Sequence, residues 1–381
     1  MNRKVAIIDP LGAHGSSHHF YIFGQSYGLK DNNVHISIYT NSETQDPYIE
    51  GVKLHQTFGN LFANKIAIVV AIKYLLGILK SVFHARLRGV GVFHFHIFYT
   101  NALVLFSFLL VKLLYGKLVL TVHDVDSFAK EDKFMLKSSL VYKLGDLILT
   151  HNQFSKDEIL KIDPSLEERI HIIPHGNYIP FITISNDKKK SREYLALPPD
   201  KTVLLFFGMI KKVKGLDVLL QSFKKIVVEN PDTVLLIAGR PWEHDFDYYQ
   251  RIIDKHHLAK NIILHTKFIP DHDVTHYYCA SDLVVLPYKR IYQSGVLMMT
   301  LSYERAVLAS DLLPLKDIII DNENGFLFKS EDVNDLAKKL KLILSDKENL
   351  ERVRKNGTDL IKDKFSWEKI GRLTKKAYQS L

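Results

Sequence analysis

Three lysines gather in one short loop between an apolar strand and a helix. The segment "FFGMIKKVKGLDVLL" ends a strand at Gly208, carries Lys211, Lys212 and Lys214, and opens a helix at Gly215. Ammonium groups beside a helix N-terminus suit a diphosphate, because the charge on a departing diphosphate grows during a transfer reaction. No Walker serine or threonine follows the lysine, which argues against a P-loop ATPase. A solvated basic turn is the alternative.

A second loop of this kind lies further along the chain. The segment "LPYKRIYQSGVLMM", residues 286–299, leaves a strand and opens a helix at Gly295, directly after Gln293 and Ser294. Backbone amides at a helix N-terminus, with side-chain oxygens next to them, can bind polyhydroxylated or anionic groups. Ser294 could equally be a simple N-cap. Taken with the lysines, this loop favours a nucleotide-linked sugar as the ligand.

Two loops in the first half also follow strands. In "TVHDVDSFAKED", His123 and Asp124 come directly off a strand end, where a general base or a ligand for a sugar hydroxyl would be placed. A structural hydrogen bond is the alternative. In "DPLGAHGSSHHF", glycines let backbone amides approach an anion, although a tight turn would look the same. Gly12 and Gly15 do not form a G-x-G-x-x-G fingerprint, so a nicotinamide dinucleotide is disfavoured.

The elements that must position these loops are short β-branched runs alternating with amphipathic stretches, which is typical of βαβ units around parallel sheets. Strands are predicted at "KVAIID", "VHISIYT", "VFHFH", "KLVLTV", "DLILT" and "RIHIIP", and then at "TVLLFFG", "TVLLIAG", "NIILHT", "DLVVLP", "AVLAS" and "GFLF". Ligands of open parallel sheets bind at the carboxyl ends of the strands. We therefore expect an α/β protein with two Rossmann-like domains whose strand ends face a shared cleft.

The alternation breaks between Tyr178 and Lys201, where a charge run and a Pro-Pro pair cannot continue a sheet. This break predicts the domain boundary. The predicted parts are an N-terminal acceptor-facing domain over residues 1–180, a linker with a short helix over residues 181–200, a C-terminal donor-binding domain over residues 201–362 and a C-terminal helix over residues 363–381.

The composition is that of a soluble globular protein, with 46% hydrophobic and 24% charged residues. A chain of 381 residues exceeds the size at which one core stops growing, which favours two domains. The single cysteine, Cys279, leaves no disulfide framework and no thiolate metal site. The first apolar run is too short for a secretory h-region. We expect a cytoplasmic protein that binds no metal.

The net charge of +9 is unevenly distributed, because residues 51–123 contain eight lysines and arginines and no acidic residue. Lys65, Lys73 and Lys80 recur near helical spacing on an apolar stretch that falls short of roughly 18 uninterrupted apolar residues. Such a helix can lie in the interface of an anionic membrane. A core helix with lysines reaching the surface is the alternative. Nucleic acid is disfavoured, since neither zinc-finger spacing nor an RNP motif occurs.

With these loops in place, the chain resembles the glycosyltransferases of family 4, which have the GT-B fold, over nearly its full length. The resemblance is carried by "FFGMIKKVKGLDVLLQSF", "LLIAG", "ASDLVVLPYKRIYQSGVLMMTLSYERAVLAS" and "DNENGFLF", and by "IIPHGN" at the end of the first half. It implies a nucleoside-diphosphate sugar held mainly by the C-terminal domain and an acceptor held mainly by the N-terminal domain. It also implies C-terminal helices that cross back to the N-terminal domain, and no cofactor.

The resemblance assigns roles to residues of all four loops. His123 would lie near the transferred sugar, and His123 or Asp124 would be the base if the reaction inverted the anomeric carbon. The donor-binding residues implied are Gly15, Ser16, Gly208, Lys211, Lys214, Gln293, Ser294, Gly295 and Val296.

Three positions depart from the family pattern. Met299 stands where many members have the glutamate that binds ribose, and Glu304, in place of the glycine of a usual G-x-P, is the substitute we predict for donor binding. Met209 replaces an arginine that often follows Gly208, which leaves Lys211 as the nearest basic residue. These changes leave the nucleobase open.

We expect a retaining, metal-independent hexosyltransferase that uses a UDP- or GDP-linked sugar. Its acceptor would be a lipid-linked or growing saccharide of a capsule, exopolysaccharide or lipopolysaccharide, at the cytoplasmic face of the membrane. A sugar-nucleotide epimerase of the same fold would instead turn over the donor without an acceptor. A non-catalytic homologue would bind the donor without turnover.

Overall fold

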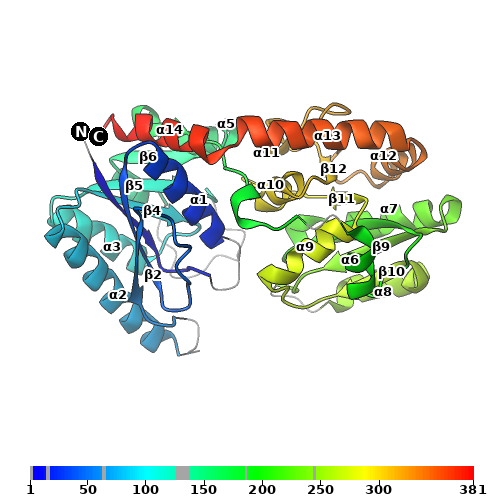
Figure 1. The fold of residues 1–381 in the computed structure, drawn as a ribbon, viewed down its shortest axis with the longest axis horizontal. Helices are drawn as coiled ribbons and strands as arrows, with labels where there is room; N and C mark the ends of the chain where they lie inside the picture. The colour runs from blue at the N-terminus through cyan, green and yellow to red at the C-terminus, as the bar shows by residue number, and fades with distance from the viewer. Residues whose placement is uncertain (1–2, 14–17, 62–65, 126–137, 185–186, 243–245) are drawn as a thin grey trace. The chain divides into compact units, whose positions relative to one another are not determined.

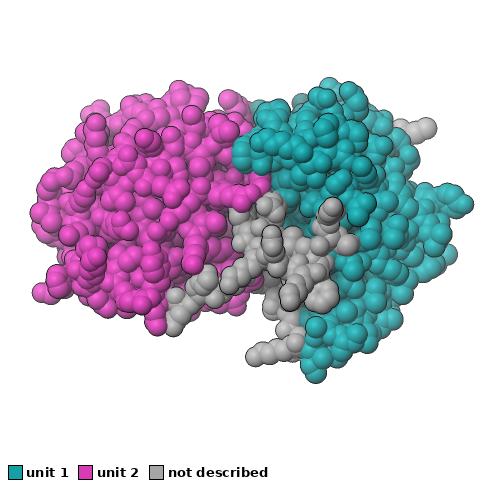
Figure 2. All heavy atoms as spheres, turned by 180° about the vertical axis from the view of Figure 1, so that it is seen from behind, with its two compact units in different colours: residues 1–176, 365–381 teal, residues 177–364 magenta. Residues whose placement is uncertain are grey.

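The computed structural model describes residues 3–13, 18–61, 66–125, 138–184, 187–242 and 246–381. The chain forms two compact units, shown in teal and magenta in Figure 2. Unit 1 comprises residues 1–176 together with residues 365–381, and unit 2 comprises residues 177–364. The C-terminal segment thus belongs to the same unit as the N-terminal half.

Unit 1 is built on one parallel sheet of seven strands in the order β3-β2-β1-β4-β5-β6-β7. Its strands read as near-continuous apolar runs, because a parallel sheet is covered on both faces. The bounds are β1 Lys4–Asp9, β2 His35–Asn41, β3 Lys53–Phe58, β4 Val92–Ile97, β5 Lys117–Val122, β6 Leu147–Thr150 and β7 Ile170–Ile172. The sequence pattern misses β3, "KLHQTF", since an edge strand with polar side chains carries little apolar signal.

Helices cover both faces of this sheet (Figure 1). They are α1 His18–Asp31, α2 Ala67–Leu87, α3 Ala102–Leu113, α4 Ser138–Lys143, α5 Gln153–Ile162, the 3₁₀ turn η1 Pro164–Arg169 and α14 Trp367–Tyr378. The last helix packs along α1, which confirms the predicted return of the C-terminal helix. Gly24 and Gly28 make this possible, because a Cβ at either position would overlap Trp367.

Unit 2 has a parallel sheet of six strands in the order β10-β9-β8-β11-β12-β13. The strands are β8 Thr202–Phe207, β9 Thr233–Ala238, β10 Ile262–His265, β11 Leu283–Leu286, β12 Ala306–Ser310 and β13 Phe326–Phe328. The helices are η2 Ile179–Phe181, α6 Lys188–Tyr194, η3 Lys212–Lys214, α7 Leu216–Glu229, α8 Asp247–Lys255, η4 Ala259–Asn261, α9 Asp271–Ala280, α10 Gly295–Ser302, α11 Leu313–Lys316, α12 Val333–Ser345 and α13 Lys347–Lys364. Two Rossmann-like sheets confirm the predicted fold class.

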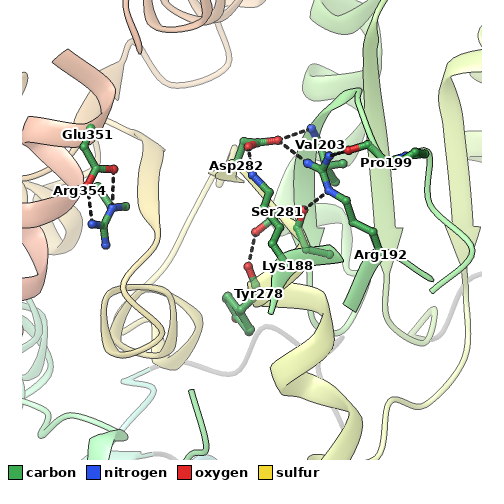
Figure 3. A network of polar contacts seen from close by, with 10 residues as sticks. Lys188, Arg192, Pro199, Val203, Tyr278, Ser281, Asp282, Glu351 and Arg354 are labelled. Atoms are coloured by element: carbon green, nitrogen blue, oxygen red, sulfur yellow. Dashed lines mark hydrogen bonds and ion pairs between the residues drawn. The ribbon is translucent and has the colours of Figure 1, made fainter. Parts of the chain in front are cut away.

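The segment predicted as a linker carries helix α6, which packs against α9. Asp282, just before β11, holds α6 in place (Figure 3). Its carboxylate accepts a hydrogen bond from Arg192 Nη2 at 2.9 Å and from the Val203 N–H at 2.7 Å, and it also contacts Lys188 Nζ. Arg192 is buried, so this carboxylate supplies the partner that a buried guanidinium requires.

Candidate functional site

The lysine loop of unit 2 is anchored by two glycines. Gly208 follows β8 with φ of 100°, and Gly215 precedes α7 with φ of 67°, a region that side chains other than glycine rarely adopt. A Cβ on Gly215 would overlap the carbonyl oxygen of Pro287, in the loop after β11. The Lys289 N–H also donates to the Val213 carbonyl at 2.9 Å. The loops after β8 and β11 are therefore joined at the carboxyl edge of the sheet.

The lysine side chains of this loop lie over aromatic rings. Lys214 Nζ is 3.8 Å from the centre of the Tyr288 ring, and Lys211 Nζ is 5.0 Å from the centre of the Trp242 ring. An aromatic face attracts a cation without neutralising it as a carboxylate would. No ion pair of Lys214 occurs in the part of the chain that the structure describes, whereas Lys289 Nζ pairs with Asp217 at 2.7 Å.

Helix α10 begins at the same edge. Ser294 caps it, because its Oγ accepts the Leu297 N–H at 3.1 Å. The Nε2 atom of Gln293 is buried and has no hydrogen-bond partner among the described residues. A Cβ on Gly208 would lie 3.3 Å from Val296 Cγ2, so the first turn of α10 lies against the end of β8. The structure thus brings together Gly208, the lysine loop and residues 293–296.

Glu304 is not brought to this edge. It lies beyond the C-terminal end of α10, about 12 Å along a helix of eight residues from Gly295. Its carboxylate pairs with Lys362 Nζ at 2.7 Å and with Arg354 Nη1 at 3.8 Å. Its φ of 56° is the left-handed conformation that a glycine adopts more readily. The predicted role in ribose binding has no geometric support from this position.

In unit 1, His123 is buried directly after β5 and is 6% exposed. Both of its ring nitrogens face other imidazoles, with Nε2 2.9 Å from His96 Nδ1 and Nδ1 3.1 Å from His151 Nε2. Phe98 stacks on the ring at a centroid distance of 4.5 Å. Asp124 follows in the same loop and is half-buried. Gly15 and Ser16 lie outside the described residues.

Six buried or half-buried histidines form a cluster in unit 1, five of them in ring contact with Tyr21 and the sixth, His94, stacked on His96. Burial lowers the pKa of each. The pKa is about 3 for His18, His94 and His175, about 4 for His151, and well below the ordinary value for His96 and His123, where neighbouring imidazoles add to the effect of burial. All six are neutral near pH 7. Burial also raises the pKa of Asp9, at the end of β1, to about 6.

Residues 187–360 match the family model described as glycosyl transferases, group 1. The part of the chain that carries this match, from α6 into α13 of unit 2, is that of a group 1 glycosyltransferase. Putative glycosyltransferase YtcC of Bacillus subtilis (strain 168) is 24% identical over 281 residues, which are 70% of this chain and 68% of that protein. The capsular polysaccharide biosynthesis glycosyltransferase CapM of Staphylococcus aureus is 26% identical over 231 residues, 58% of this chain and 60% of that protein.

The fold of this glycosyltransferase is also that of solved GT-B structures. HepE of Anabaena in complex with UDP-glucose superposes with a TM-score of 0.75 over 99% of this chain and 100% of that one, at 15% identity. The matched family is one of transferases, which favours a glycosyltransferase over the epimerase and the non-catalytic homologue.

Sequence reasoning missed most of the histidine cluster of this glycosyltransferase. His94 and His96 alternate along β4, and His151 and His175 each follow a short apolar run, so every one of them comes from a strand or its carboxyl end. Repetition of one titratable residue type at successive strand ends was the available signal. Sequence reasoning also did not identify the buried carboxyl of Asp9 at the end of β1.

Proposed function

We propose that this chain transfers a hexose from a UDP- or GDP-linked sugar to a lipid-linked or growing saccharide in surface polysaccharide synthesis. The observation that carries the proposal is the joined edge of unit 2, where Lys214, the Gly208 turn and the N-terminus of α10 lie together. Ammonium groups and unpaired amides there match a diphosphate, and the unpartnered Gln293 amide matches a sugar hydroxyl. CapM, by its name a capsular polysaccharide enzyme, and HepE, solved with UDP-glucose, support this class of donor and product.

In the proposed reaction, the bond between the anomeric carbon and the diphosphate oxygen breaks, the acceptor hydroxyl oxygen bonds to that carbon, and the hydroxyl proton passes to the departing diphosphate. Negative charge accumulates on that phosphate as its bond to carbon breaks. Lys211, Lys214 and the first amides of α10 would stabilise that charge in place of a metal ion. The reaction would retain the anomeric configuration, and no enzyme nucleophile would be required. His123 is poorly suited to act as a base, because both of its nitrogens already face imidazoles. Asp124 would be the base to test if the product proved inverted.

The acceptor would lie at the cytoplasmic face of a membrane, and the enzyme would bind that membrane through α2 and α3 of unit 1. Ile68, Ile72 and Leu76 are exposed along one side of α2, with Lys80 next on the same side. By length and composition α2 could also cross a bilayer. Its opposite side packs on the sheet, however, where a Cβ on Gly77 would overlap Phe58. Helix α2 would therefore lie on an anionic surface rather than span it.

The proposal is tested by titrating the protein with UDP-, GDP- and ADP-sugars and recording thermal stabilisation, then assaying the stabilising donor with lipid-linked saccharides. We expect one nucleotide family to raise the melting temperature, and sugar to appear on the acceptor with release of nucleoside diphosphate. Epimerised donor without an acceptor would support the epimerase instead. Binding without turnover across capsule, exopolysaccharide and lipopolysaccharide acceptors would support a non-catalytic homologue.

A further inference from the structure

Three imidazoles of unit 1 form a hydrogen-bonded chain across four neighbouring strand ends. His96 lies near the end of β4, His123 follows β5, His151 follows β6, and the chain ends on the carbonyl of Ile173 after β7. The last step joins His151 Nδ1 to the Ile173 oxygen at 3.0 Å. The ring centres are 5.2 and 4.9 Å apart, close to the spacing of about 4.8 Å between strands. The sheet itself therefore sets the spacing of the chain.

The Ile173 carbonyl determines where each proton lies. A carbonyl oxygen can only accept, so His151 Nδ1 carries the hydrogen, and the Nε2 of this neutral ring must accept from His123 Nδ1. The same step repeats, because His123 Nε2 must then accept from His96 Nδ1. All three rings are the Nδ1–H tautomer, and His96 Nε2 is left as an acceptor.

Gln25 stands at the open end of the chain. It is fully buried in α1, and its Oε1 atom faces His96 Nε2 at 3.2 Å, while its Nε2 atom has no partner among the described residues. Two acceptors would then face each other. A half-turn of the amide brings an N–H donor to His96 and removes this conflict, because the two ends of an amide have nearly the same shape.

A metal ion is the competing occupant of this cluster, since ligand atoms of His18, His96 and His123 all lie within 4.8 Å of one another. Two imidazoles on a tetrahedral zinc, each about 2.05 Å from the metal, would hold their nitrogens about 3.3 Å apart. The observed separation of 2.9 Å between His96 Nδ1 and His123 Nε2 is that of an N–H to N hydrogen bond. This spacing favours hydrogen-bonded imidazoles over a bound zinc ion.

We propose that His151 and Gln25 are positioning residues that hold His123 as a neutral Nδ1–H imidazole at the carboxyl edge of the unit 1 sheet. That this imidazole acts on the transferred sugar rests on the proposed function. Positive charge develops on a sugar ring as its bond to the leaving group breaks, so an imidazolium beside it would oppose the reaction. Neutral imidazoles in fixed positions would not oppose that positive charge.

Nitrogen-15 spectra of the histidine rings in the full-length protein test the tautomers without any substrate. We expect Nδ1–H signals for His96, His123 and His151 that stay unchanged between pH 7.5 and pH 6. Imidazolium or Nε2–H signals for His123 would overturn the proposal. So would displacement of these signals by one equivalent of Zn²⁺ alone, since that result would identify a metal site. Because this readout needs no turnover, it stands apart from any failure of the proposed function.

The Gln25→Glu variant tests whether the hydrogen-bonded imidazoles affect catalysis. A carboxylate can only accept, so it would draw a second proton onto His96 and make the chain cationic. We expect kcat to fall roughly tenfold while the KM for the donor changes little. Gln25→Leu removes the end partner without adding charge and should lower kcat less than Gln25→Glu does. His272→Gln, at an exposed histidine of unit 2, is the matched control. Equal loss in both Gln25 variants would reduce the residue to a packing role and overturn its part in the proposal.

Discussion

The two sheets of this protein end in edges of different charge, one neutral and one cationic. At the carboxyl edge of unit 1, imidazoles are buried against one another and lose their charge, as for His123. At the corresponding edge of unit 2, Lys211 and Lys214 lie over aromatic rings, and α10 presents its N-terminus. Both edges come from the same parallel architecture. The comparison shows that the fold determines where a functional site can form, at the carboxyl edge of a sheet, while a few side chains determine the charge of that edge.

This difference suits a reaction that separates charge. In the proposed transfer, negative charge grows on the diphosphate and positive charge on the sugar. Cations on one sheet and neutral rings on the other would stabilise the first without opposing the second.

The largest expected effect is a selective loss of stability of unit 1 in acid. The histidine pKa values are lower in the folded state than the ordinary 6.5, so below pH 6.5 the unfolded chain binds more protons, and stability falls as the pH falls toward 4. Each neutral imidazole costs about 1.4 kcal/mol per pH unit in that range. Asp9 acts in the opposite direction between pH 6 and pH 4, but it is a single group.

The two tryptophans separate the units in this experiment. Trp367 is buried in unit 1 and Trp242 is 37% exposed in unit 2, so Trp242→Phe leaves fluorescence that reports on unit 1 alone. Hydrogen exchange at β8 reports on unit 2. We expect unit 1 to open at a higher pH than unit 2. Loss of both signals at one pH, or none by pH 5, would contradict the contrast between the edges.

The second effect concerns the cationic edge. Replacing Lys211 and Lys214 together with alanine should lower kcat/KM by about 1,000-fold, because two ammonium groups that stabilise the leaving diphosphate are lost. The melting temperature should change little, since both side chains are only half-buried and lie on a loop outside the hydrophobic core. Affinity for nucleoside diphosphate is measured by calorimetry. Lys255→Ala with Lys260→Ala is the matched pair on the same unit. Full activity in the first variant would reject the diphosphate site.

A smaller effect is expected at the exposed side of α2. Ile72→Glu should weaken binding to anionic vesicles about tenfold, because it removes an apolar contact and adds a negative charge near anionic lipid. Sedimentation with vesicles of increasing anionic content, at low and high salt, measures it. Val228→Glu places the same change on an exposed valine of unit 2 and should have no effect. If vesicle binding depends neither on lipid charge nor on the Ile72→Glu substitution, the proposed membrane contact of α2 is wrong.

The smallest effect is expected at Glu304. Because its carboxylate pairs with Lys362 and Arg354 at the far end of α10, Glu304→Gln should change donor affinity by less than about twofold. Titration of the variant with the donor identified by the thermal screen measures this. A tenfold loss would restore Glu304 as a ribose ligand.

The sequence by itself determined the fold class and which loops follow strands. Twelve strands could be predicted, because the buried strands of a parallel sheet are mostly apolar and β-branched, even where β4 carries His94 and His96. The turn at Gly208–Gly215 and the start of α10 at Gln-Ser-Gly could also be predicted, because turns and helix N-termini have local sequence signals of their own. The polar edge strand β3 lacked that signal.

Only the tertiary structure decided which strand ends lie side by side. His96, His123, His151 and Ile173 are separated by more than 20 residues at each step, and the order β4-β5-β6-β7 alone makes them a chain. The packing of Gly215 on Pro287 and the removal of Glu304 from the lysine loop likewise depend on contacts between distant segments. Periodicity along a chain reports how each element meets the core, whereas hydrogen bonds between elements depend on which elements are neighbours.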